Sequence, residues 1–131
     1  MSIDTLAAWH ALVRSHDPAG LAALIAEDAV FHSPVVHRPQ AGHALVRQYL
    51  QAAFTVFFNP SFRYVRELAG PRDAVLEFEL ELDGVHVNGV DMIRWRDDGR
   101  IVDFKVMLRP LKAVNLIHQK MAAALQAGPG A

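Results

Sequence analysis

The hydrophobic period of the chain changes once, near Phe62, and this change limits the folds that the chain can adopt. Before Phe62, apolar side chains recur every three to four positions, as in amphipathic helices; after it, they alternate with polar ones, as in half-buried strands. Helices followed by an antiparallel meander indicate an α+β domain. The 131 residues, of which 52% are hydrophobic, can fill one core, so we expect a single domain.

The N-terminal half predicts three helices with one short strand between the second and the third. Asp17-Pro18 supplies an N-cap and a proline at the first helical position of the second helix. The third helix has the clearest amphipathic pattern and ends at Asn59-Pro60. The expected elements are a helix over 3–15, a helix from 18 to about 27, a strand over 29–33, a loop over 35–42 and a helix containing 46–57.

The C-terminal half predicts four strands and a closing helix. Asp83-Gly84 and Asp98-Gly99 are expected to form two-residue hairpin turns, because both central positions of a type I′ turn need positive φ. The domain is expected to cover residues 1–126, with a flexible tail over 127–131. The expected elements are strands over 62–69, 74–82, 85–96 and 101–109, and a helix over 111–125.

Two-residue turns fix which side chains share a face of the sheet. Leu76 then lies opposite Asp91, and Asp91 lies opposite Val106. One face becomes almost wholly apolar, Val102 included, and Asp91 is its only charged side chain. A carboxylate held away from water costs several kcal/mol unless it is hydrogen-bonded, and its pKa is expected to rise.

Two interpretations of Asp91 are open at this point. A carboxyl group with a perturbed pKa in an apolar cleft is a candidate functional residue. Alternatively, Asp91 is a buried acid that is hydrogen-bonded to a helix side chain or that lies near a solvated edge of the sheet.

The segments DPAGLAALIAEDAVFHSP and VNGVDMIRWRDDGRIVDFKV resemble the nuclear-transport-factor-2-like superfamily, in its SnoaL-like and ketosteroid-isomerase-like branch. The resemblance covers nearly the whole chain. It implies a cone-shaped, curved and mostly antiparallel sheet packed on N-terminal helices, a cystatin-like roll, with a C-terminal helical extension here. It also implies a tendency to form homodimers.

The resemblance places Asp91 where related isomerases keep a protonated aspartic acid and where SnoaL-type polyketide cyclases keep an acid–base aspartate. Ser33 stands at the position of the isomerase general base, and Trp9 at that of the oxyanion-hole tyrosine. A serine without an adjacent base cannot shuttle a proton at neutral pH, and an indole donates more weakly than a phenol. Conventional ketosteroid isomerisation is therefore not expected. The limonene-epoxide-hydrolase pattern also fails, because it requires an arginine at Gly89.

The leading hypothesis is a SnoaL-like enzyme of isomerase, cyclase or lyase type that acts on an apolar carbonyl compound. Asp91 would be the acid–base residue, and Tyr49 a hydrogen-bond donor beside it; an ordinary core tyrosine is the alternative for Tyr49. The competing hypothesis is a non-catalytic module for binding a hydrophobic ligand or for dimerisation. The expected pocket-lining residues are Trp9, Val13, Ser33, Phe54, Phe78, Ile93, Phe104 and Leu108.

The composition of the chain and the spacing of its histidines limit the partners and cofactors that it is expected to bind. A net charge of −1 without a basic cluster argues against nucleic acid, and no stretch is apolar enough to span a membrane or to serve as a signal core, so a cytoplasmic location is expected. His32, His37 and His43 match no standard ligand spacing, so neither a metal nor another cofactor is expected. Outward-facing Val75, Val90, Met92 and Met107 predict a homodimer through the outer sheet face.

Overall fold

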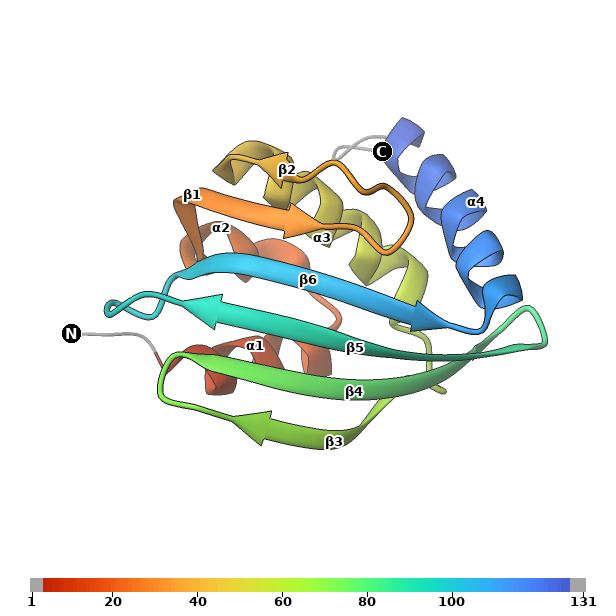
Figure 1. Ribbon diagram of the computed structural model, residues 1–131, viewed down its shortest axis with the longest axis horizontal. Helices are drawn as coiled ribbons and strands as arrows, with labels where there is room; N and C mark the ends of the chain where they lie inside the picture. Colours follow the sequence, from red (N-terminus) through yellow and green to blue (C-terminus); the bar gives the residue numbers. More distant parts are fainter. Residues whose placement is uncertain (1–3, 128–131) are drawn as a thin grey trace.

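A six-stranded sheet forms one layer of the structure, and helices form the other (Figure 1). The computed structural model describes residues 4–127. Strand order is β2-β1-β6-β5-β4-β3, and all neighbours are antiparallel except β1 and β6. The elements are α1 (Thr5–Ser15), η1 (Pro18–Gly20), α2 (Leu21–Leu24), β1 (Ile25–His32), β2 (Gln40–Ala41), α3 (His43–Phe57), β3 (Arg63–Ala69), β4 (Asp73–Leu82), β5 (Val85–Trp95), β6 (Ile101–Arg109) and α4 (Leu111–Ala127).

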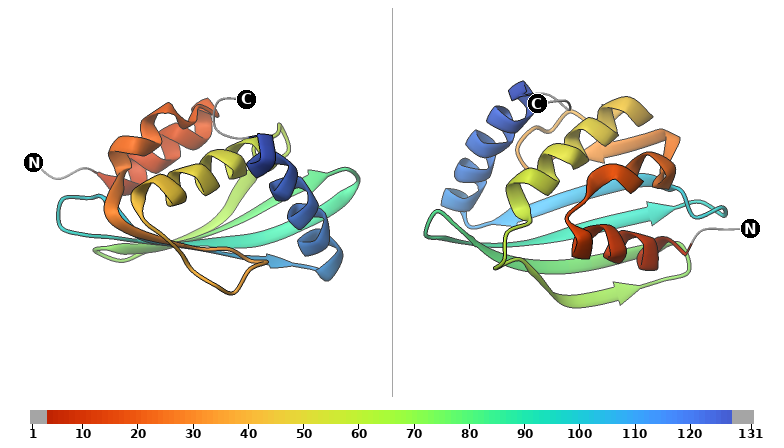
Figure 2. Two further views of the ribbon diagram at one scale, coloured as in Figure 1. Left: turned by 90° about the horizontal axis from the view of Figure 1, so that it is seen from above. Right: turned by 180° about the vertical axis from the view of Figure 1, so that it is seen from behind.

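The helices lie on one side of the curved sheet, and the core lies between the two layers (Figure 2). Helices α1 and α3 cover this inner face, and α4 follows β6 and packs against α3 (Figure 1). The expected α+β architecture, with a curved and mostly antiparallel sheet, is confirmed; the sheet is open. Residues 128–131, which make up most of the expected tail, lie outside the described residues.

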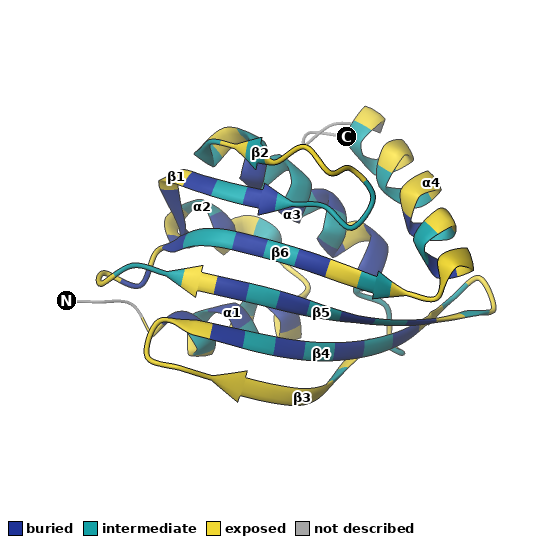
Figure 3. Cartoon of the chain, in the orientation of Figure 1, coloured by how far each residue is buried: buried dark blue, intermediate teal, exposed yellow. Residues whose placement is uncertain are grey.

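Burial alternates along β4 and β5, as the period of two predicts (Figure 3). The predicted register is confirmed, because Leu76 pairs with Asp91, and Asp91 with Val106. The turn at Asp83-Gly84 has positive φ at both residues, 49° and 77°, as a type I′ turn requires. This register turns the side chain of Asp91 toward the helices.

The second hairpin differs from its predicted geometry. In the Asp98-Gly99 turn only Gly99 has positive φ, and the register shifts so that Trp95 pairs with Ile101. The extra residue is a bulge, which reverses the facing of side chains next to the turn. Ile101 is therefore fully buried, and Val102, which was predicted to face inward, is only half-buried.

The second predicted helix is shorter than the pattern indicated. It is divided into η1 and the four-residue α2, and the chain is already extended at Ile25 instead of remaining helical to about Glu27. Ile25 pairs with Ile101 in the parallel β1–β6 ladder and is buried. Sheet pairing and burial of a β-branched side chain outweigh the helical preference of the flanking alanines.

Candidate functional site

Asp91 is a buried carboxylate on the inner face of the sheet. It sits mid-strand on β5, between Leu76 of β4 and Val106 of β6, and only 7% of its surface is exposed. Both neighbours are buried hydrocarbon, which cannot solvate a negative charge. The charge therefore has to be stabilised by hydrogen bonds or removed by protonation.

Tyr64 of β3 supplies the hydrogen bond to this carboxylate. The Tyr64 hydroxyl donates to Oδ2 of Asp91 over 2.6 Å, and Nε1 of Trp9 in α1 donates to the Tyr64 oxygen over 2.9 Å. An indole nitrogen can only donate, so the Tyr64 hydrogen points toward Asp91 and Oδ2 acts as the acceptor. Oδ1 makes no hydrogen bond within residues 4–127 and stays free for another partner.

Burial raises the pKa of Asp91 from its usual value near 3.8 to about 7, although the hydrogen bond from Tyr64 acts in the opposite direction. Burial of its hydroxyl and the nearby Asp91 carboxylate raise the pKa of Tyr64 well above its usual value. Tyr64 therefore remains a donor across the range in which Asp91 titrates. The pair can exchange a proton with a third molecule only through Asp91.

A small cavity of about 30 Å³, the inner cavity, lies beside Asp91. Its walls are largely aromatic, and Trp9 packs edge-on against Phe54 and at 5.0 Å from Phe104. Four of the predicted pocket residues, Trp9, Phe54, Phe78 and Phe104, line this cavity together with Asp91. Its volume suits one water molecule or a single functional group of a ligand.

A larger cavity of about 140 Å³, the outer cavity, adjoins the first under α4 and the loop after β1. Ser33 and Tyr49 line this outer cavity and not the inner one. The Tyr49 ring packs at 5.4 Å from Phe31, and no hydrogen bond joins Tyr49 to Asp91 in the described part of the chain. Tyr49 therefore is not the immediate partner of Asp91 that the sequence suggested.

The three remaining predicted pocket residues have other surroundings. Val13 is a buried core residue of α1, and Leu108 of β6 pairs with Gly89 of β5. Ile93 is a fully buried core residue on β5. In the described part of the chain, none of these three residues lines the inner or the outer cavity.

A bulge in β3 explains why the sequence did not identify Tyr64. Counting back from the β3–β4 turn without a bulge pairs Tyr64 with Glu79 and points it outward. The register instead shifts between Tyr64 and Arg66, so that Tyr64 pairs with Phe78 and points inward. The available signal was Phe62 two residues earlier, since an aromatic pair at i and i+2 marks one buried face.

The three histidines around the loop after β1 have separate partners. His32 contacts Asp103 of β6 over 2.8 Å, and His43 contacts the Ala22 carbonyl over 2.8 Å. His37 is exposed. Within residues 4–127, no group of three or more histidine, aspartate or glutamate side chains has an arrangement suited to a metal ion.

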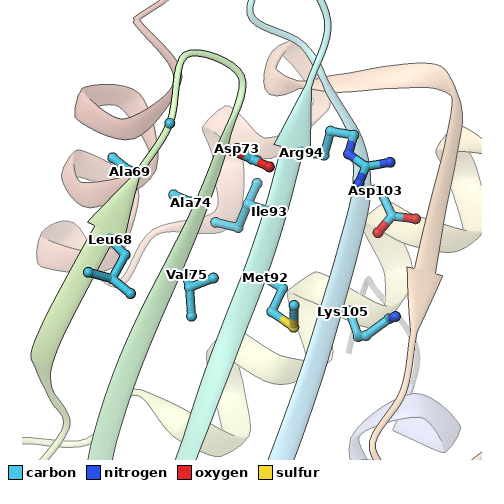
Figure 4. A pocket seen from close by; sticks show the side chains of 11 residues that line it. Leu68, Ala69, Asp73, Ala74, Val75, Met92, Ile93, Arg94, Asp103 and Lys105 are labelled. Carbon is cyan, nitrogen blue, oxygen red and sulfur yellow. The ribbon is translucent and has the colours of Figure 1, made fainter.

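A shallow hollow marks the outer face of the sheet (Figure 4). Val75, Met92 and the charged side chains of Arg94 and Lys105 lie along it, on β4 to β6. Neither of these two cations forms a salt bridge with a described residue. This surface is on the opposite side of the sheet from Asp91.

Comparison with known proteins identifies the family of the chain. The model of the SnoaL-like domain matches residues 6–104, which include Asp91, Tyr64 and Trp9. The chain belongs to the SnoaL-like domain family. This confirms the resemblance seen in the sequence to the SnoaL-like branch of the nuclear-transport-factor-2-like superfamily. No match is found among curated proteins.

Solved structures of similar proteins share the fold over nearly the whole chain. A steroid delta-isomerase from Pseudomonas aeruginosa is 43% identical, with a TM-score of 0.89 over 94% of this chain and 90% of its own. A protein with a cystatin-like fold from Silicibacter pomeroyi DSS-3 is 32% identical, with a TM-score of 0.83 over 92% and 84%. A protein from Mesorhizobium loti described as NTF2-like is 26% identical, with a TM-score of 0.71 over 82% and 89%.

The described helices contain no stretch that is long and apolar enough to cross a membrane.

Proposed function

We propose that the protein is a small-molecule enzyme in which Asp91 moves a proton on an apolar carbonyl compound. The observation that carries the proposal is a carboxylate with one free oxygen, held by Tyr64 at the wall of an aromatic cavity. A pKa of about 7 makes both protonation states available at neutral pH, which acid–base catalysis requires. The similarity to a steroid delta-isomerase supports an isomerase-type reaction.

The hydrogen-bond chain assigns separate roles to the residues of the site. Trp9 orients Tyr64, and Tyr64 orients Asp91 through Oδ2, so both are positioning residues. Oδ1 of Asp91 is the atom that would accept the proton. The aromatic walls exclude water and leave room beside this oxygen for the reacting group of the compound.

The reaction that suits this arrangement is proton abstraction next to a carbonyl group. The C–H bond α to the carbonyl breaks, its proton forms an O–H bond on Oδ1, and the electron pair moves to the carbonyl oxygen as an enolate. Return of the proton from Asp91 to another carbon of a conjugated enolate gives an isomer and restores the ionised carboxylate. The step needs no co-reactant, because every proton and electron stays in the complex.

Deuterium exchange tests this step without knowledge of the natural substrate. The protein is incubated in D₂O with 4-methylcyclohexanone, and loss of the α-hydrogen signals is followed by NMR. We expect exchange to exceed that in buffer, to increase as Asp91 ionises through about pH 7, and to fall by about 100-fold or more in Asp91→Asn.

The matched control is Asp28→Asn, because the Asp28 side chain is 80% exposed. This variant should exchange the ketone as fast as the unmodified protein. Equal exchange in Asp91→Asn and in the unmodified protein would contradict the role of Asp91, and so would exchange no faster than in buffer.

The inner cavity also supports a second candidate, a binding module without turnover. A volume of about 30 Å³ beside Asp91 is far below that of cavities that hold drug-sized ligands. In this alternative an apolar ligand occupies the outer cavity and extends one small group into the inner cavity, where Asp91 only orients that group. Ligand binding without deuterium exchange at any pH would favour this candidate.

We also propose that the outer sheet face forms a two-fold homodimer. Leu68 and Met107 on this face are 62% and 51% exposed, and Leu68 lines the hollow in Figure 4 together with the charged side chains of Arg94 and Lys105. Exposed apolar side chains beside charges of both signs are typical of a self-complementary interface.

A further inference from the structure

The outer cavity has a polar side chain that the sequence did not single out. His118 of α4, an exposed residue, lines it together with Ser33 and Tyr49, and the other lining residues include the apolar side chains of Phe31, Ile117 and Met121. His118 comes from the closing helix, outside the residues that match the family model. The lining of the outer cavity thus combines apolar side chains with three polar ones, which come from three separate segments of the chain.

These three polar side chains have unused hydrogen-bonding capacity. Neither Tyr49 nor His118 forms a side-chain hydrogen bond with another described residue. The Ser33 hydroxyl accepts from the backbone nitrogens of Val35 and Val36 over 3.0 and 3.3 Å, so its own hydrogen remains available for donation. A hydroxyl group in the outer cavity can therefore both donate and accept a hydrogen bond there, and a carbonyl oxygen can accept one.

The outer cavity shares part of its lining with the inner cavity beside Asp91. Ala53, Phe57 and Val106 line both cavities, and Val106 is also the cross-strand neighbour of Asp91. A ligand in the outer cavity therefore lies one side chain away from the carboxylate. The inner cavity has room for only a small group of that ligand.

We propose that Tyr49 and His118 hold the oxygen-bearing end of a small apolar ligand in the outer cavity. The ligand class is a single-ring or short-chain carbonyl compound with a second oxygen, a hydroxyl or a carbonyl, at the end away from the reacting group. About 140 Å³ is below the range for drug-sized ligands, so a body of several fused rings does not fit. For the reacting end of the ligand, beside Asp91, this proposal rests on the proposed function. It adds Tyr49 and His118 as the residues that bind the opposite end of the ligand.

The test compares p-cresol with toluene, which differ by one hydroxyl group. Binding is followed by amide shifts in ¹H–¹⁵N NMR spectra, which also show whether each variant is folded. We expect p-cresol to shift amides of α4 and of the loop after β1, and its Kd to rise about 3- to 10-fold in Tyr49→Phe and in His118→Ala. The Kd of toluene should stay unchanged in both variants.

Two further variants separate a specific contact from a structural effect. His118→Gln keeps a donor and an acceptor and should restore part of the p-cresol affinity. Gln119→Ala replaces the exposed neighbour of His118 on α4, which does not line the cavity, and should bind p-cresol as the unmodified protein does. Equal weakening of p-cresol and toluene, or amide shifts confined to the outer sheet face, would overturn the proposal.

Asp91→Asn distinguishes this proposal from the proposed function. This variant should keep its affinity for p-cresol, because Asp91 lines the inner cavity and not the outer one. One possible result is that deuterium exchange depends on Asp91 while the Kd of p-cresol is the same in Tyr49→Phe, His118→Ala and the unmodified protein. This result would overturn the inference and leave the proposed function standing. The reverse pattern would overturn the function alone.

Discussion

At the scale of single residues, burial of the ionised Asp91 carboxylate lowers the stability of the fold. Its pKa of about 7, against a usual 3.8, means that the folded chain binds the proton more tightly than the unfolded chain. The contribution of Asp91 to stability therefore decreases as pH rises from about 4 to about 7 and is constant above that range. At about 1.4 kcal/mol per pKa unit, the loss amounts to a few kcal/mol. A buried carboxylate that lowers stability in this way is explained better by a functional role than by a structural one.

Asp91→Asn should remove this dependence on pH. The amide oxygen can still accept from Tyr64, and no charge has to be buried. We expect the free energy of unfolding of the variant, relative to the unmodified protein, to increase by a few kcal/mol between pH 4.5 and pH 8. Urea unfolding at several pH values, monitored by tryptophan fluorescence, measures this difference.

Asp28→Asn serves again as the control, because an exposed carboxylate should give a difference that hardly changes with pH. A difference for Asp91→Asn that is the same at pH 4.5 and pH 8 would show that Asp91 titrates normally. Direct ¹³C NMR titration of the Asp91 carboxyl group would then place its pKa near 4.

At the scale of elements, β5 depends on a glycine two residues before Asp91. A Cβ atom at Gly89 would lie 2.6 Å from the Met107 carbonyl oxygen, 2.6 Å from Cζ of Phe78 and 2.7 Å from Cδ2 of Leu108. The backbone of β6 and a fully buried ring cannot move aside easily. Because Gly89 has no side chain, the Phe78 ring can pack directly against the β5 backbone, where it forms part of the wall of the inner cavity.

Gly89→Ala should destabilise the protein by about 2 kcal/mol or more, as overpacking of a core does. Gly20→Ala is the matched control, because its Cβ would meet only the end of the flexible Leu12 side chain, at 2.7 Å. We expect that variant to change stability by less than about 1 kcal/mol. Urea unfolding at a single pH compares the two, and equal effects would mean that β5 and β6 can separate at Gly89 at little cost.

The same strands show how far the sequence could predict the structure. The type I′ turn at Asp83-Gly84 fixed the β4–β5 register, and with it the inward direction of Asp91. Bulges in β3 and beside the β5–β6 turn could not be predicted, because each depends on packing with a neighbouring strand. Tyr64 and Ile101 face inward for that reason. The position of His118 in the lining of the outer cavity depends on how α4 packs against the rest of the domain, which no local pattern encodes.

At the scale of the whole molecule, the two faces of the sheet have different surroundings. The inner face and the helices enclose the two cavities, whereas the outer face is open (Figure 2). On the outer face, Arg94 and Lys105 lie toward one end of the strands, and Glu79 and Glu81 lie toward the other. A two-fold axis through this face would place the cations of one copy against the glutamates of the other.

Met107→Glu tests the proposed dimer, because this exposed side chain lies on the outer face and next to Val90 of β5. The unmodified protein should have the mass of a dimer in light scattering at micromolar concentration, and the variant that of a monomer, since a buried carboxylate at the interface costs several kcal/mol. Leu111→Glu is the control, because Leu111 is 74% exposed at the start of α4, beyond the sheet. Its mass should remain that of a dimer. A monomeric unmodified protein would contradict the dimer and leave the two cavities unaffected, since both are lined by one chain.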